Sequence, residues 1–165
     1  MKHWTKLSTV STNPSDIDTI EKWCYNNDDN NCTNEWWLYT WYEAMWLSST
    51  QTTITTEDTA KSVCWQLWIW WHLPSDADHT ALITAWATWW TWNKLLWLIV
   101  SYLWGYRPYI GSSYSSIYNN SVLWSSNWYN STYSLASSLN SWDSTINSSS
   151  TWNKLTWASL FCIKN

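Results

Sequence analysis

Apolar side chains in the N-terminal half of the chain recur every three or four positions, a spacing that predicts amphipathic helices. Three such stripes precede Pro74, which ends the third, and Ser75 begins the next helix. The stripes are Ile17, Ile20, Trp23 and Cys24 after the N-cap candidate Ser15, then Trp37 or Leu38 with Trp41, Ala44 and Met45 after Asn34, and Ala60, Val63, Cys64, Leu67, Trp68 and Trp71 after Thr55 or Thr56.

Residues 75–104 form the longest apolar stretch and predict one continuous helix. Gly105 follows this stretch and Pro108 comes three residues later, a pattern that is typical of a helix end. Beyond its first turns, the only strongly polar residues are Asn93 and Lys94. A helix that is apolar on all sides lies in a protein core or in a membrane. Because Lys94 would lie near the middle of a bilayer, we expect a buried central helix.

Residues 112–150 differ in character, since 16 of these 39 residues are Ser and aromatic residues are interspersed among them. Apolar positions such as Leu135 and Leu139 keep helical spacing, which predicts two or three Ser-rich helices held by packing. Strands are one alternative, because Trp, Tyr, Thr and Ile favour them, although neither Gly105 nor Gly111 follows Asn or Asp as in a tight hairpin turn. A second alternative is that residues 112–150 are disordered, as segments that alternate polar and aromatic residues often are.

Together these patterns predict an all-α fold, in which a single domain of residues 1–165 packs five to seven helices around the helix at 75–104. The N-terminal half, 1–78, is acidic, and the C-terminal half, 112–165, is rich in Ser and aromatic residues. The alternative is an α-rich fold whose Ser-rich C-terminal region is partly disordered or β-prone. With 165 residues, the chain is long enough to bury a core.

Charge argues against a nucleic-acid partner. The net charge is −4, and Arg107 is the single arginine of the chain. Binding to phosphate groups requires clustered Lys and Arg, so aromatic stacking on bases would lack its main source of affinity here. We expect no binding to nucleic acid.

The four cysteines, Cys24, Cys32, Cys64 and Cys162, permit three sets of two disulfides. Cys24 and Cys32 flank a loop that is short enough for a disulfide to close. The alternative is that the cysteines are reduced and buried as small apolar side chains. No C-x-x-C pair is present, so zinc-ribbon and thioredoxin-like chemistry lacks its signature.

Acceptor sequons for N-glycosylation occur at Asn31, Asn119, Asn130 and Asn147, but they matter only in a secretory compartment. The N-terminal residues 1–6 lead into polar sequence, without the apolar region of a signal peptide. The sequence therefore leaves the compartment unassigned and favours a soluble protein over a membrane protein.

His72, Asp76 and His79 are the best candidates for metal ligands, because on one unbroken helix their spacing would place all three on one face. Pro74 interrupts that helix, so we expect no metal site and no cofactor. No G-x-S-x-G elbow and no glycine-rich phosphate loop is present either. The sequence therefore predicts that the protein is not an enzyme.

The chain has 21 Trp and one Phe, which suggests that Trp replaces Phe as the filler of the core. Each buried indole N–H needs an acceptor, and we expect Ser, Thr and Asn oxygens to supply it. Adjacent tryptophans cannot both face one core, so some must be exposed. Trp36, Trp70 and Trp89 are the candidates for exposed contact residues.

These observations favour a non-catalytic helical scaffold or protein-interaction domain, which binds a protein partner or a second copy through exposed Trp. The unusual composition raises the hypothesis that the sequence is artificial and has no cellular activity. One alternative is a membrane-interface or lipid-binding protein that contacts the membrane through residues 81–104. Another is a secreted helical-bundle signalling protein with disulfides.

Overall fold

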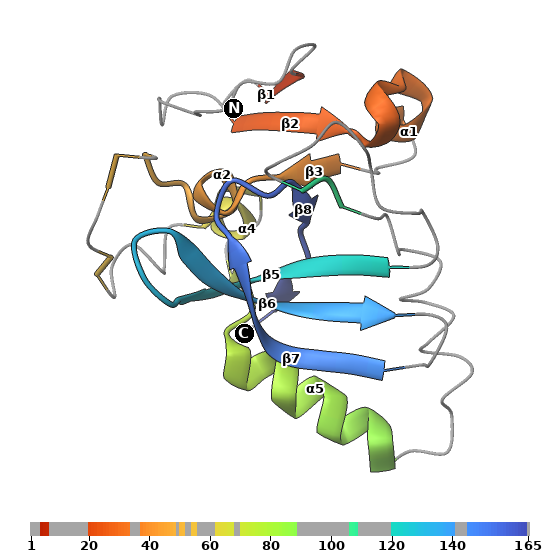
Figure 1. Ribbon diagram of the computed structural model, residues 1–165, viewed down its shortest axis with the longest axis vertical. Helices are drawn as coiled ribbons and strands as arrows, with labels where there is room; N and C mark the ends of the chain where they lie inside the picture. The colour runs from red at the N-terminus through yellow and green to blue at the C-terminus, as the bar shows by residue number, and fades with distance from the viewer. Residues whose placement is uncertain are drawn as a thin grey trace.

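The computed structural model of the chain contains a mixed β-sheet of seven strands, together with a separate pair of short strands (Figure 1). The structure describes residues 4–6, 20–33, 37–48, 50–51, 54–55, 62–67, 70–88, 106–108, 120–140 and 145–164.

The strands of the large sheet follow the order β1-β2-β3-β8-β5-β6-β7. Neighbours pair antiparallel, except for the parallel pairs β1–β2 and β5–β8. Strands β4 and β9 form the separate antiparallel pair. The strands are β1 Trp4–Lys6, β2 Ile20–Cys24, β3 Trp37–Tyr39, β4 Trp71–His72, β5 Asn120–Trp128, β6 Tyr133–Asn140, β7 Thr145–Asn153, β8 Ala158–Ser159 and β9 Ile163–Lys164.

Helices in the described part of the chain are short, except for α5 below β7 in Figure 1. They are the 3₁₀ turn η1 Tyr25–Asn27 and the α-helices α1 Asp29–Thr33, α2 Trp41–Met45, α4 Val63–Leu67 and α5 Asp76–Thr88.

Two consecutive residues of β6 show that both faces of the sheet are covered, because successive side chains of a strand point to opposite faces. Ala136 packs in the main core with Trp124 of β5 and Trp41 of α2, and all three are fully buried. The next side chain, Ser137, bonds to His79 of α5. The C-terminal part of the sheet therefore lies between α2 and α5.

The prediction of an all-α fold is wrong, because the described chain is dominated by strands. The alternative is wrong in expecting an α-rich fold, but the Ser-rich C-terminal region that it considered β-prone does form strands. The error in residues 112–150 has a simple cause. Leu135 and Leu139 are four residues apart, a spacing that matches one face of a helix but is also a multiple of the two-residue repeat of a strand. Strands β5, β6 and β7 take up the described residues of this region, apart from the turn between β5 and β6.

The helices predicted before residue 74 also need correction. Residues 20–24 and 37–39 are strands, and the second stripe retains only the five-residue α2. The hydroxyl of Thr40 accepts a hydrogen bond from the Glu43 amide and caps α2. In the third stripe, α4 covers residues 63–67, after which residues 71–72 form β4.

The described part of the predicted central helix does not form the centre of the core. Ala77, Thr80, Ala81 and Thr84 of α5 are exposed at i, i+3, i+4 and i+7, so one face of this helix lies against solvent. The main core instead gathers around α2, in which Trp41 and its neighbours are buried.

Residues 89–104 lie outside the described residues, so a membrane contact through 81–104 stays a prediction. Within the part of the chain that the structure describes, no helix has the length and apolar character needed to cross a membrane.

Two disulfides join the four cysteines. Cys24 at the end of β2 is bonded to Cys32 in α1, which closes the turn between them. Cys64 in α4 is bonded to Cys162, 98 residues later and next to β9. The second bond ties the middle of the chain to its last strand.

Strand β7 contains a bulge. Ala136 pairs with Ser150 and Ser138 pairs with Asn147, so β7 has one more residue than β6 between these two pairs. Ser149 lies inside the bulge with φ of 62°, in the left-handed region that non-glycine residues seldom enter.

Candidate functional site

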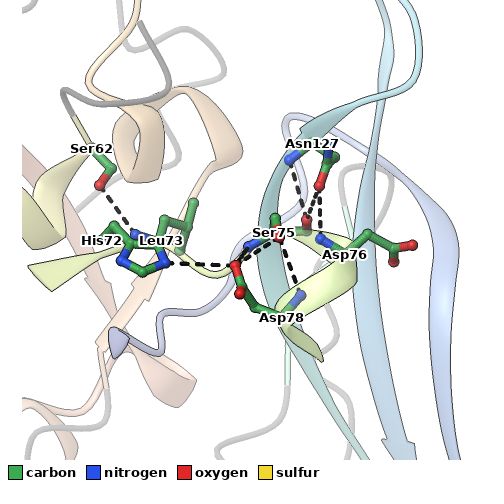
Figure 2. A network of polar contacts seen from close by, with 8 residues as sticks. Ser62, His72, Leu73, Ser75, Asp76, Asp78 and Asn127 are labelled. Atoms are coloured by element: carbon green, nitrogen blue, oxygen red, sulfur yellow. Dashed lines mark hydrogen bonds and ion pairs between the residues drawn. The ribbon is translucent and has the colours of Figure 1, made fainter. Parts of the chain in front are cut away.

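A polar network surrounds the first turn of α5 (Figure 2). Ser75 and Asp78 bond reciprocally, as in a capping box: the Asp78 amide donates to Ser75 Oγ at 3.1 Å, and the Ser75 amide donates to Asp78 Oδ2 at 2.8 Å. The Asp76 amide donates to Asn127 Oδ1 at 2.7 Å, which fixes the helix end to β5. Each of these contacts satisfies a backbone N–H at or beside the start of the helix.

The carboxylate of Asp78 stays ionised at this helix start. Burial alone would raise its pKa, but hydrogen bonds from Ser75 and the nearby His72 hold the pKa below its ordinary value. The distance from His72 Nε2 to Asp78 Oδ2 is 3.5 Å. This network stabilises the helix, and none of its contacts requires a ligand.

The candidate metal ligands His72, Asp76 and His79 point to different partners. His72 contacts Asp78, Asp76 Oδ2 accepts a hydrogen bond from the Ser149 hydroxyl at 2.6 Å, and His79 contacts β6. In Figure 2 the carboxylate of Asp76 points away from His72. Among the described residues, no group of three or more His, Cys, Asp or Glu side chains is arranged to hold a metal ion.

His79 and Ser137 form a buried pair on opposite sides of the α5–β6 contact. The distance from His79 Nδ1 to Ser137 Oγ is 2.7 Å, and the two residues are 4% and 2% exposed. Burial lowers the pKa of His79 to about 4, against the opposing attraction of two nearby aspartates. In many enzymes a histidine activates a neighbouring serine hydroxyl as a nucleophile. Here the Ser137 hydroxyl is buried, so a substrate could not reach it in this conformation.

Lys154 is another buried titratable residue, at 2% exposed. Its Nζ lies 4.6 Å from the ring centre of Trp41, 5.5 Å from that of Tyr42 and 5.4 Å from that of Trp128. Burial lowers the pKa of Lys154 to about 8. The sequence gives no local signal for this site, because Trp41 and Tyr42 precede Lys154 by more than 100 residues.

The backbone of Lys154 joins the same elements as its side chain. Its amide donates to the carbonyl of Thr132 at 3.0 Å, and its carbonyl accepts from the amide of Trp41 at 2.9 Å. Lys154 therefore anchors the turn between β5 and β6 to the buried helix α2.

The buried indoles of Trp41 and Trp124 find acceptors other than those we expected. Trp41 Nε1 donates to the carbonyl of Ser125 at 2.8 Å, and Trp124 Nε1 donates to the carbonyl of Tyr39 at 2.9 Å. The acceptors are backbone carbonyls and not Ser, Thr or Asn side chains, because strands bring carbonyl groups beside the rings.

Exposed large apolar side chains among the described residues fall into two groups. The first, which we call the disulfide cluster, consists of Trp65, Trp70 and Phe161, at 42%, 63% and 39% exposed. The second lies in the hairpin tip, residues 128–133, which run from the end of β5 to the start of β6 at the left of Figure 1. It consists of Trp128, Tyr129 and Tyr133, at 42%, 63% and 43% exposed.

The backbone of the disulfide cluster is held by covalent and hydrogen bonds. Trp65 follows Cys64 and Phe161 precedes Cys162, the two halves of one disulfide. Trp70 directly precedes β4, which pairs with β9 just beyond that disulfide. These exposed rings are therefore attached to a restrained part of the chain.

Trp70 also has an unusual backbone conformation, with φ of 82°. A bulky residue at positive φ is strained, and such strain persists where the surrounding structure enforces it, often at functional sites. Of the three tryptophans that we singled out from the sequence, Trp70 is exposed, whereas Trp36 and Trp89 lie outside the described residues.

Comparisons of the chain with protein-family models, with curated proteins and with solved structures found no match.

Proposed function

We propose that this chain is a non-catalytic protein-binding domain and that the disulfide cluster is its contact surface. The observation that carries the proposal is Trp70, which is 63% exposed and held at φ of 82°. Tryptophan is enriched among the residues that contribute most to protein interfaces, because its large rigid ring gains contact area at a small cost in conformational entropy.

The restraint of the cluster supports the same function. A surface that is ordered before binding loses less entropy in the complex, so more of the contact energy appears as affinity. The disulfide of Cys64 with Cys162 and the β4–β9 pair supply this order. The buried state of His79 and Lys154 supports a non-catalytic role, because a catalytic group must reach its substrate.

The test selects binders from a displayed peptide library on the full, disulfide-bonded chain and measures the Kd of each binder for variants. Trp70→Asn removes the ring and places at positive φ a residue that tolerates it. We expect this change to weaken binders by about 10- to 100-fold. Tyr129→Ser is the matched control, because Tyr129 is equally exposed but belongs to the hairpin tip.

Binders that are weakened by Tyr129→Ser and not by Trp70→Asn would contradict the proposed contact surface. Sedimentation equilibrium of the unmodified chain and of Trp70→Asn tests a second copy as the partner. Association that the substitution abolishes would identify the partner as this chain itself.

A further inference from the structure

The hairpin tip carries the acceptor motif Asn130-Ser131-Thr132, which lies outside the proposed contact surface. The motif for N-glycosylation is Asn-x-Ser/Thr, in which the sugar is attached to the side-chain nitrogen of Asn.

The turn holds Asn130 by its oxygen and leaves its nitrogen available. Asn130 Oδ1 accepts hydrogen bonds from the backbone amides of Thr132 and Tyr133, both at 2.8 Å. Asn130 Nδ2 and the Thr132 hydroxyl make no hydrogen bond to any described residue. Thr132 is exposed and Asn130 is half-buried at the surface.

The other described sequons use these groups within the fold. At the first, Asn31 Nδ2 donates to the carbonyl of Tyr25 at 2.7 Å, and the Thr33 hydroxyl donates to the carbonyl of Asp29 at 3.1 Å. Among the sequons within the described ranges, both groups are available only at Asn130.

At Asn147, the third residue of the sequon is Ser149, whose hydroxyl donates to Asp76 Oδ2 at 2.6 Å. Asn119 lies outside the described residues.

Exposed aromatic residues flank Asn130 in the sequence. Trp128, Tyr129 and Tyr133 lie within three residues of it, and each is more than 40% exposed. The C–H face of a sugar ring packs on the face of an aromatic ring, while the sugar hydroxyl groups remain in water. Tyr and Trp suit this contact, because their ring faces are apolar and their polar groups can stay hydrated. A glycan on Asn130 would cover apolar surface that the fold leaves in solvent.

The disulfides place the chain in a compatible compartment. All four cysteines are paired, and such bonds persist in the oxidising secretory pathway, where N-glycosylation also takes place. We propose that Asn130 is an N-glycosylation site and that the first sugars of its glycan pack against the aromatic rings of the hairpin tip.

The donor in this reaction is an oligosaccharide carried on a lipid diphosphate. Asn130 Nδ2 forms a bond to C1 of the first sugar, while the bond from C1 to the diphosphate oxygen breaks. The diphosphate leaves with its electron pair, and the amide nitrogen loses one proton to solvent.

The first test expresses the full chain behind a cleavable secretory signal in eukaryotic cells, and measures intact mass before and after enzymatic removal of N-glycans. Thr132→Ala is the decisive variant, because it removes the hydroxyl of the motif and keeps the backbone amide that Asn130 binds. We expect a glycan at Asn130 that Thr132→Ala abolishes and that Ser131→Ala and Asn147→Gln leave in place. Secreted, disulfide-bonded protein that is unmodified at Asn130 would overturn the assignment.

The second test addresses the packing of the glycan. We compare thermal midpoints of glycosylated and deglycosylated chain in the unmodified protein and in Trp128→Ala. The glycan is expected to raise the midpoint by about 2–4 °C in the unmodified chain and by less in the variant. An equal rise in both would show that the sugars do not pack on Trp128.

Discussion

The imidazole Nδ1 of His79 lies 2.7 Å from the hydroxyl oxygen of Ser137, in a contact that joins α5 to β6. Both residues are buried, and Nε2 of the same ring has no hydrogen-bond partner among the described residues. Burial therefore favours the neutral ring, because protonation of both ring nitrogens would place a positive charge in a site that is shielded from water.

This pair predicts a loss of stability in mild acid. The pKa of His79 is about 4 in the folded chain, below its ordinary value of 6.5, so the unfolded chain binds the proton more readily between these values. The stability that the neutral ring contributes is fully present above pH 6.5 and is lost as the pH falls towards 4. We expect the free energy of unfolding to be about 2 kcal/mol lower at pH 5 than at pH 7.5, as measured by urea denaturation.

The control for this prediction is His79→Leu combined with Ser137→Ala. The double variant removes the titrating ring without leaving the serine hydroxyl alone in an apolar site. Its free energy of unfolding should vary much less between pH 5 and pH 7.5 if His79 causes the loss. An unchanged pH dependence would assign the acid sensitivity to other groups.

Lys154 predicts a change in stability at alkaline pH. Its folded pKa of about 8 is below the ordinary 10.5, so the unfolded chain retains a proton that the folded chain releases. Stability should therefore rise as the pH increases from 7.5 to 9.5, a range below the raised pKa values of Tyr39 and Tyr42. Guanidinium denaturation of the chain and of Lys154→Met measures this rise, which the variant should lack.

The two disulfides are expected to contribute unequally to stability. In the chain-entropy description, the bond between Cys64 and Cys162 restrains a loop with a sequence separation of 98 and contributes about 4–5 kcal/mol, against about 2–3 kcal/mol for the separation of 8 between Cys24 and Cys32. Paired Cys→Ser substitutions at each bond, compared by thermal denaturation, test this order. A larger loss from the shorter loop would show that strain or residual structure outweighs the entropy of the unfolded chain.

The capping box at α5 provides a local test. Ser75→Ala removes the hydroxyl that accepts the Asp78 amide, and we expect the free energy of unfolding to fall by about 1 kcal/mol. Ser75→Asn, which restores a side-chain acceptor, should recover most of this loss in the same urea titration. A loss that Ser75→Asn does not recover would indicate that packing of Ser75, and not capping, is responsible.

Local features of the fold were predictable from sequence, whereas strand pairing was not. Pro74 and Ser75 correctly marked the start of α5, because a proline break and an N-cap act on adjacent residues. The strands were missed because the spacing of Leu135 and Leu139 satisfies both helix and strand periods, and because Asn130 forms the hairpin turn without the Asn-Gly pair that we sought.

The buried polar sites depend on contacts between distant parts of the chain. The His79–Ser137 pair spans 58 positions, and the rings around Lys154 come from α2 and β5.

The exposure of Trp70 could be predicted from the sequence, because Trp70 and Trp71 are adjacent and cannot both face one core. The positive φ of Trp70 could not be predicted, since nothing in the neighbouring residues requires it.

The bulge at Ser149 affects how the edge of this sheet could pair with the sheet of another molecule. Strand β7 is the last of the described sheet and contains no charged residue, so it lacks the lysines by which many proteins discourage a neighbouring sheet from docking edge to edge. The extra residue displaces the backbone hydrogen-bonding groups partway along the strand, and a straight strand from another molecule would find its register broken there. The kink at Ser149 therefore interrupts the row of backbone groups with which a second sheet would pair along this edge.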